Sequence, residues 1–177
     1  MNKWYTRLSI AALLGGCIYF LIHYKYIIIS FDRSSYHVVS SSNNAVKKQI
    51  NFYFYNNDAW QKESVELVWS KNPEQALKTV ANQWFTLAHA EKLITKNITV
   101  SHASLTVDGK AYLNFDQLPF SQQQLVREKF FLIQGLLKSI KESGLAITGV
   151  YFLMNNQPFY DYHLDFSIPW SLEPYVP

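Results

Sequence analysis

The chain has 177 residues, a net charge of +3 and one cysteine, and 16% of its residues are aromatic. Of the 16 basic and 13 acidic residues, residues 1–33 hold four and one, which leaves twelve of each in the rest of the chain. That part is therefore neutral and offers no basic stripe to nucleic acid. It also lacks cysteine, which excludes a disulfide or a thiolate site there.

Residues 1–30 have the pattern of a membrane anchor. Lys3 and Arg7 precede an apolar run over residues 8–22, and a basic start before an apolar segment is typical of an export signal or an anchor. Extended to Tyr26, this segment would reach about 28 Å, close to the hydrocarbon thickness of a bilayer. We expect an uncleaved, single-pass signal-anchor in the cell membrane, with the rest of the chain outside the cytoplasm.

Two other interpretations of this segment remain open. Residues 14–17 (LGGC) resemble a lipobox, which would lead to cleavage before Cys17 and lipidation of that residue. The residues after Cys17 stay apolar, whereas a mature lipoprotein usually begins with a polar tether, so we favour the spanning anchor. A buried core helix is the third interpretation. We expect residues 31–47, rich in Ser and Asn, to form a flexible tether, residues 48–170 one domain, and residues 171–177 a C-terminal tail.

The first half of the domain alternates as strands do and then becomes helical. Residues 50–55 (INFYFY) and 65–69 place apolar side chains at every second position, with a turn at residues 56–58 between them. Residues 72–75 (NPEQ) supply a capping Asn, a Pro suited to the first helical position and a Gln at capping-box spacing. They predict a helix that ends near Glu91.

Asp108 and Gly109 lie between two further strand patterns and are typical of a hairpin turn. A two-residue turn would place Leu105 and Val107 on the same face as Lys and Tyr side chains. An odd loop length, or a bulge, would group both with the apolar residues of 111–115 instead. We favour that register because it follows the buried face.

A second helix is expected from Ser121 to Gly144. Ser121 can cap it, with Gln124 at capping-box spacing and Phe120 and Leu125 at the positions of a hydrophobic staple. One face of this helix is apolar, and it consists of Val126, Phe130, Leu132, Ile133, Leu136, Leu137 and Ile140.

Residues 147–154 (ITGVYFLM) then form a near-continuous apolar run, which indicates a strand covered on both faces. Together the elements predict an α/β (α+β) domain in which two helices pack on a mixed β-sheet, preceded by an N-terminal transmembrane helix. The aromatic content predicts a core rich in Phe, Tyr and Trp.

The sequence carries no recognisable catalytic motif. The five histidines do not stand at ligand spacing with Cys, Asp or Glu, and no zinc-protease, serine-hydrolase or phosphate-loop pattern occurs. Asp161, His163 and Asp165 form the closest polar cluster, but they lie in a tail rich in Tyr and Phe. We therefore expect a protein that is not an enzyme and that uses neither a cofactor nor a metal.

Aromatic residues concentrate near the C-terminal end, where they alternate with prolines. Some of them should complete the core. Others could form a contact surface for a partner, since aromatic side chains supply many interface hot spots. The candidate contact residues are Phe159, Tyr160, Tyr162, Trp170 and Tyr175.

In this order the elements resemble the GerM domain, known from sporulation and spore-germination proteins and from bacterial envelope lipoproteins. That family opens with a strand ending in Tyr-Phe, like residues 50–54, and continues to a hairpin built around Asp-Gly, like residues 105–115. A long helix then leads to a strand and a closing Pro, similar to residues 148–153 and 164–169. The resemblance covers about residues 48–170 and implies a membrane-tethered, non-catalytic module.

We therefore expect a membrane-anchored, extracytoplasmic interaction module of the bacterial cell envelope. Its expected partners are the membrane and envelope proteins or the cell wall, and a homo-oligomer is also considered. The alternative is an envelope enzyme acting on peptidoglycan, which a deep polar cleft around Asp161, His163 and Asp165 would favour. A third hypothesis is a small-ligand sensor or carrier, which an enclosed aromatic pocket would favour.

Overall fold

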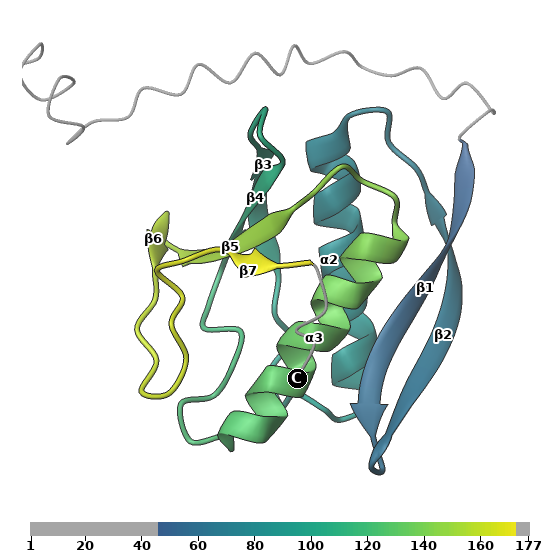
Figure 1. The fold of residues 1–177 in the computed structure, drawn as a ribbon. Helices are drawn as coiled ribbons and strands as arrows, with labels where there is room; N and C mark the ends of the chain where they lie inside the picture. Colours follow the sequence, from purple (N-terminus) through teal and green to yellow (C-terminus); the bar gives the residue numbers. More distant parts are fainter. Residues whose placement is uncertain (1–45, 173–177) are drawn as a thin grey trace, which may run out of the picture. The chain divides into compact units, whose positions relative to one another are not determined.

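The computed structural model describes residues 46–172, which form two helices and seven strands (Figure 1). In chain order, the elements of the described residues are β1 (Lys47–Asn56), β2 (Ala59–Val68), α2 (Pro73–Ala90), β3 (Val100–Leu105), β4 (Lys110–Phe115), α3 (Val126–Glu142), β5 (Gly149–Met154), β6 (Gln157–Pro158) and β7 (Trp170–Ser171). The predicted anchor lies outside the described residues. Within them, no helix is both long and apolar enough to cross a membrane.

The described strands form two separate sheets, and the two helices lie between them (Figure 1). β1 and β2 make an antiparallel hairpin. The second sheet has the order β3-β4-β5, and β6 and β7 both pair with β5. β4 and β5 run parallel and the other described pairs run antiparallel, so this second sheet is mixed, as predicted.

The separate hairpin corrects the prediction of one sheet that carries both helices. The outer edge of β1 lies against α3, so no further strand of the described residues pairs with it. There the Tyr53 amide donates to Ser139 Oγ (2.9 Å), and Trp84 Nε1 donates to the Tyr53 carbonyl (3.0 Å). Gly135 permits this close approach, because a Cβ at that position would lie 2.5 Å from the Tyr53 carbonyl oxygen.

A chain of aromatic rings crosses the core from the hairpin to the second sheet. The Phe54 ring lies 5.6 Å from that of Trp84, which lies 5.0 Å from Phe85. Phe85 then lies 5.4 Å from Phe115 of β4, and Phe115 lies 6.0 Å from Phe152 of β5. All five side chains are buried, which confirms the prediction of a core rich in aromatic residues.

The apolar alternation of β1 is as predicted, but β2 begins at Ala59, six residues before the predicted strand, and the turn consists of Asn57 and Asp58 alone. Ile50, Phe52 and Phe54 are at most 4% exposed and face the core, and the hairpin turn places Asn57 and Asp58 at φ of 50° and 57°. Two consecutive residues with positive φ are what a two-residue turn of type I′ requires. The buried apolar face of β1 and the two-residue turn together fix the register of β1 and β2.

The N-terminus of α2 is also as predicted. Asn72 Oδ1 accepts hydrogen bonds from the amides of Glu74 (2.9 Å) and Gln75 (3.3 Å), and Pro73 is the first helical residue. The Asn72 amide itself donates to Ser70 Oγ (3.1 Å), so Ser70 takes the role expected of the Gln75 side chain. This cap supplies partners for amides that have none within the helix.

The turn between β3 and β4 has an odd length, as expected. The Thr106 amide donates to the Lys110 carbonyl (2.9 Å), which leaves three residues at the tip, and Leu105 lies opposite Ala111. Val107 is one of the three tip residues and is fully exposed, so its predicted place on the apolar face was wrong. A three-residue loop needs Val107 as a turn residue, and β3 therefore ends two residues before it.

α3 begins at Val126, five residues after the predicted cap. Residues 121–124 form a turn of their own, in which the Gln124 amide donates to the Ser121 carbonyl (3.1 Å). The residue before the helix is Leu125, which makes no side-chain cap and is 68% exposed. Both the Ser121 cap and the staple through Leu125 were therefore wrong.

The reason for the late start of α3 is a lysine in its first turn. The buried Lys129 ammonium donates to the Gln122 carbonyl (3.4 Å). In a longer helix that carbonyl would accept from the Val126 amide instead. The ammonium has three N–H groups, so after its ion pair with Asp161 it still takes the Gln122 carbonyl as a second acceptor, because unsatisfied buried donors are costly.

Candidate functional site

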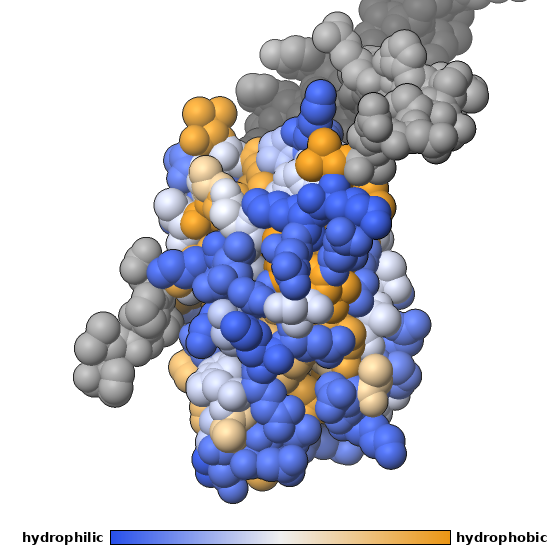
Figure 2. Space-filling view, turned by 90° about the vertical axis from the view of Figure 1, so that its right-hand side faces the viewer, coloured by the Kyte–Doolittle hydropathy of each residue, from blue (hydrophilic) through white to orange (hydrophobic). Residues whose placement is uncertain are grey.

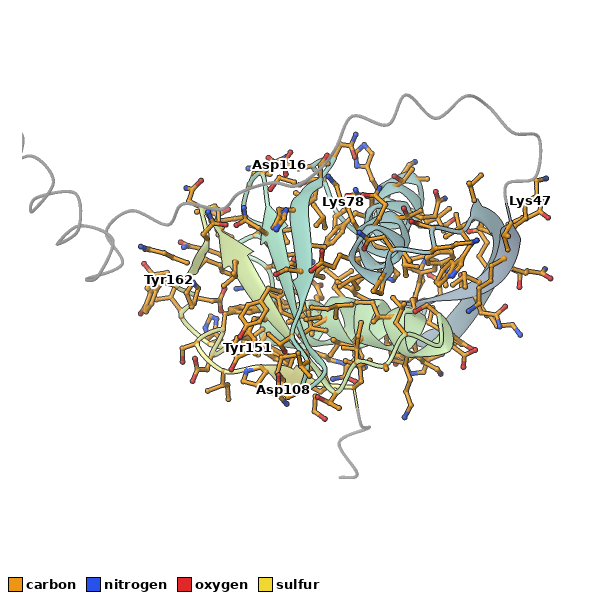
Figure 3. The ribbon with its side chains drawn as sticks, turned by 90° about the horizontal axis from the view of Figure 1, so that it is seen from above. Lys47, Lys78, Asp108, Asp116, Tyr151 and Tyr162 are labelled. Carbon is orange, nitrogen blue, oxygen red and sulfur yellow. The ribbon has the colours of Figure 1, made fainter. Side chains whose placement is uncertain are left out.

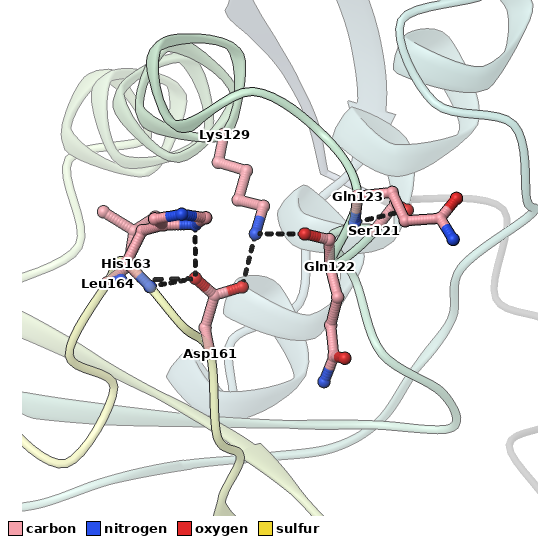
Figure 4. Close-up of polar contacts among 7 residues, drawn as sticks. All are labelled: Ser121, Gln122, Gln123, Lys129, Asp161, His163 and Leu164. Carbon is pink, nitrogen blue, oxygen red and sulfur yellow. Dashed lines mark hydrogen bonds and ion pairs between the residues drawn. The ribbon is translucent and has the colours of Figure 1, made fainter.

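Residues 159–169, called the β6–β7 loop below, carry most of the residues that the sequence singled out. A buried ion pair fixes this loop to α3 (Figure 4). Lys129 Nζ lies 2.5 Å from Asp161 Oδ2, and the two side chains are 0% and 2% exposed. Because neither charge is accessible to water, each depends on the other, and the pair holds the loop in one position.

The Asp161 carboxylate is also bound within the loop. Its Oδ1 accepts hydrogen bonds from the amides of His163 (3.0 Å) and Leu164 (3.2 Å). Burial alone would raise the pKa of Asp161, but the hydrogen bonds from Lys129 and the two amides, with the charge of Lys129, outweigh it and hold the pKa below its ordinary value. The carboxylate is therefore ionised at neutral pH and serves to shape the loop.

Two phenylalanines attach the loop to the core. The rings of Phe159 and Phe166 lie 4.2 Å apart, and Phe166 lies 5.7 Å from Phe152 of β5. Phe159 was a candidate contact residue, but its side chain is buried beside Phe166. This is a correction, since an enclosed ring stabilises the loop from within and offers almost no area to a partner.

Tyr160 and Tyr162 point outward from the same loop. They are 71% and 68% exposed, and their rings meet edge to face at 5.3 Å. Figure 3 shows Tyr162 at the outside of the described domain. The structure thus brings these two candidate residues together, and we call them the tyrosine surface.

The remaining candidates lie elsewhere. Trp170 opens β7, where it pairs with Val150, and its ring packs at 5.7 Å against Phe166. It is only partly exposed and belongs to the edge of the core. Tyr175 and Cys17 lie outside the described residues. The tyrosine surface therefore excludes Trp170 and makes no use of Tyr175.

The polar cluster of the loop does not form a deep polar cleft. Asp161, His163 and Asp165 line one open hollow of about 500 Å³ that is bounded by residues 158–167. Asp161 is occupied by Lys129, and Asp165 Oδ1 accepts from the amide and the hydroxyl of Ser167 (2.8 and 2.6 Å). These bonds lower the pKa of Asp165. Each carboxylate thus has a structural partner. The deep polar cleft that would favour an envelope enzyme is not found around these three residues.

Two further hollows adjoin the start of α3. One of about 500 Å³ lies between the β1–β2 turn and α3; Tyr55 and Phe131 line it, their rings stack on each other at 3.8 Å, and it is open to solvent. The other, of about 770 Å³, runs between residues 93–98 and residues 118–124, and it is lined by polar and apolar side chains together. It is open to solvent and contains one aromatic residue, Phe120, which is buried. Neither is the enclosed aromatic pocket that a ligand carrier would need. Among the described residues, no group of three His, Cys, Asp or Glu could hold a metal ion.

Sequence reasoning missed Lys129, which positions the whole loop. Its signal was present, because Lys129 stands three residues after Val126 and four before Ile133, on the apolar face of the helix. A lysine on such a face is almost never buried without an acidic partner. The structure supplies that partner as Asp161, the one acidic residue that is buried among the described residues.

The comparisons with known proteins agree with this architecture. The model of the Germane family, described as "Sporulation and spore germination", matches residues 51–159, more than half of the chain. The chain therefore belongs to this family, and the resemblance to the GerM domain is confirmed. The family is described by sporulation and germination, not by an enzymatic activity. No curated protein matches the chain.

Three solved structures are similar to it at low identity. The first GerMN domain of the sporulation protein GerM from Bacillus subtilis is 16% identical, with a TM-score of 0.47, over 70% of this chain and 97% of that one. The "Putative Lipoprotein" of Clostridium perfringens is 14% identical, with a TM-score of 0.43, over 71% and 87%. The tandem GerMN domains of B. subtilis GerM are 12% identical, with a TM-score of 0.42, over 77% and 49%. The chain thus spans about half of the tandem structure.

Proposed function

We propose that this protein is a non-catalytic interaction module of the bacterial cell envelope and that the tyrosine surface binds its partner. Membership of a sporulation and germination family and the apolar run at residues 8–22 support the envelope location. One observation carries the binding role: two exposed tyrosines project from a loop that a buried ion pair holds in place.

Rigid support makes these tyrosines suitable for binding. A side chain on a mobile segment loses conformational freedom when it binds, and that loss weakens the complex. Asp161, between Tyr160 and Tyr162 in the sequence, is tied to Lys129 and to two amides, so the backbone is already fixed. Tyrosine also offers a large apolar ring with a hydroxyl, which suits an interface at a wet surface.

The proposed partner is a protein of the envelope or a cell-wall polymer, which a side-chain crosslink can identify. A photoreactive phenylalanine analogue replaces Tyr160 or Tyr162 in the full chain, in the native cell. Leu125 is the matched control, because it is as exposed as Tyr162, at 68%, and lies outside the loop. We expect light-dependent adducts with an envelope component from both tyrosine positions and none from Leu125.

A double variant, Tyr160→Ala with Tyr162→Ala, completes the experiment. Both side chains are exposed, so the melting temperature should stay within about 2 °C, since substitutions of exposed residues change stability little. Capture of the crosslinked component should fall at least tenfold. Adducts that form at Leu125 but not at the tyrosines, or unchanged capture by the double variant, would contradict the proposal.

A further inference from the structure

The outer edge of β2 is the longest strand edge that the described residues leave uncovered. Tyr53 of β1 directs its amide and carbonyl away from β2, toward Ser139 and Trp84. Tyr53 lies opposite Lys62, and because the backbone groups of Tyr53 point away from β2, the two residues form a non-hydrogen-bonded pair. By alternation, the residues of β2 whose backbone groups point to its outer edge are Trp60, Lys62, Ser64, Glu66 and Val68.

No other strand of the described residues pairs with this edge. The ten residues of β2 are mostly exposed, with Trp60 at 42% and Val68 at 64%. Figure 2 views the side of the molecule that carries β1 and β2, and its surface is mainly hydrophilic with apolar patches between. A long exposed edge of this kind is a template for an added strand.

The charges along β2 select the strand that fits. We propose that β2 pairs antiparallel with β2 of a second copy of this chain, about a two-fold axis at Ser64. In this register Lys62 lies opposite Glu66 of the second copy, and the same pair recurs on the other side of the axis. Trp60 lies opposite Val68 of the second copy, so the most exposed apolar residues of the strand cover each other.

Other symmetric registers lack this match. An axis at Lys62 or at Glu66 places like charges directly opposite each other, which destabilises a strand pair. An axis at Glu63 places Glu63 opposite Glu63 of the second copy. An axis at Val65 places Lys62 opposite Val68, which is apolar. The Ser64 register is therefore distinguished by charge and by hydropathy together.

Two features of the edge are consistent with a specific pairing. A lysine in the middle of an edge strand usually discourages pairing with unrelated strands. Among the symmetric registers, only the one with its axis at Ser64 places Lys62 opposite an acidic residue, so the same lysine makes the pairing specific for this register. Glu66 already contacts Lys47 (2.8 Å), and a carboxylate can accept from a second cation as well.

The pairing does not depend on the proposed function. Figure 3 shows Lys47, whose side chain contacts Glu66 of β2, on the side of the described domain away from Tyr162. A dimer through β2 would leave the tyrosine surface accessible. Tyr160→Ala should therefore leave the dimer intact, whereas variants of β2 should leave crosslinking at Tyr160 possible, and the two proposals fail separately.

A disulfide at the axis tests the register. Ser64→Cys is made in the full chain together with Cys17→Ser, so that the introduced thiol is the only one, and the protein is kept in mild detergent. Opposed residues of a hydrogen-bonded pair lie about 5.5 Å apart at Cα, within the range of a disulfide. Gln61→Cys is the control, because residue 61 is also exposed but would lie opposite Leu67 of the second copy, six residues along the strand from the other introduced cysteine. We expect oxidation to link Ser64→Cys into dimers at least ten times faster than Gln61→Cys.

Charge reversal gives an independent test that needs no thiol. Lys62→Glu and Glu66→Lys should each raise the dimer dissociation constant at least tenfold in sedimentation equilibrium, and the combined variant should return to within threefold of the original. Glu63→Lys, an equal change of charge on the same strand, should have little effect because it faces Val65. A chain that stays monomeric, equal crosslinking at Ser64→Cys and Gln61→Cys, or a dimer that Lys62→Glu does not weaken, overturns the proposal.

Discussion

β3 and β2 are both edge strands, and the fold treats them in opposite ways. Three side chains of α2, spaced one turn apart, bind the outer edge of β3. Asn82 Oδ1 accepts from the Val100 amide (2.7 Å), Lys78 Nζ donates to the Ser101 carbonyl (2.7 Å), and Glu74 Oε1 accepts from the Leu105 amide (3.1 Å). This is how a helix covers a strand edge that is not offered to another chain.

β2 shows the other solution, since its outer edge faces solvent and its side chains are mostly exposed. The β6–β7 loop resembles β3 in this respect, because the Asp161 carboxylate is satisfied inside by Lys129. The comparison teaches that helix side chains satisfy the outer edge of β3 and the Asp161 carboxylate, whereas the outer edge of β2 is left to solvent. We therefore expect substitutions to lower the unfolding free energy most where a helix side chain supplies the partner, and least on β2.

The largest loss should come from the ion pair behind the β6–β7 loop. Lys129→Met leaves the Asp161 carboxylate buried without its cation, which should lower the unfolding free energy by about 3–5 kcal/mol. Adding Asp161→Asn should recover most of that loss, because an Asn oxygen still accepts from the amides of His163 and Leu164 without a charge. Urea denaturation of all three variants makes the measurement, and a double variant no more stable than Lys129→Met would refute the role of charge.

The same pair should make stability depend on acid. The folded pKa of Asp161 lies below its ordinary value, so the ionised carboxylate stabilises the fold above that value, and the stabilisation is lost as pH falls through the folded pKa. The urea midpoint of the wild type should therefore drop more steeply than that of Asp161→Asn below about pH 4. Asp165→Asn is the surface control, and its curve should follow the wild type more closely.

The second loss of stability should come from the contact between α3 and the outer edge of β1. Gly135→Ala would place a Cβ 2.5 Å from the Tyr53 carbonyl oxygen, which is backbone and cannot turn aside. The variant should lose about 3 kcal/mol through overpacking, even though alanine favours helices. Glu128→Ala in the same helix should change stability by less than about 1 kcal/mol. A stable Gly135→Ala would show that α3 does not seal β1.

The β3 edge should respond more mildly. Asn82→Ala leaves the Val100 amide without its acceptor in a site where Val100 is fully buried, which should cost about 1–3 kcal/mol. Asn82→Asp keeps that acceptor and should lose less. Thr86→Ala, on an exposed position of the same helix, should stay within about 0.5 kcal/mol. Hydrogen exchange at Val100 would report the change directly, and unaltered protection would contradict it.

Local rules predicted most of the chain from β1 to α2. The alternation of Ile50, Phe52 and Phe54 and the cap by Asn72 depend only on residues close in sequence, and the structure confirms both. The start of α3 failed because its determinant is distant. Lys129 binds Asp161, 32 residues away, and the local capping signal at Ser121 could not compete with the need to pair a buried charge.

The candidate site was predicted in the same uneven way. Tyr160 and Tyr162 were named from composition alone, and their exposure fits the expected contact role, which remains a proposal. Phe159 belongs to the same aromatic run but lies inside, because Phe166 folds back onto it. The aromatic pattern alone does not show which side chains face inward; the ion pair of Asp161 with Lys129 and the packing of Phe159 on Phe166 decide it together.

The smallest effect on stability should come from β2, which completes the comparison. Lys62 and Glu63 are exposed, so Lys62→Glu and Glu63→Lys should each change the unfolding free energy by less than about 0.5 kcal/mol when measured at a concentration where the chain is monomeric. Lys62→Glu should nevertheless weaken self-association, while Glu63→Lys should not. A loss of stability from Lys62→Glu as large as that from Asn82→Ala would mean that the β2 edge is as firmly tied to the domain as the β3 edge, and the contrast between the two strands would no longer hold.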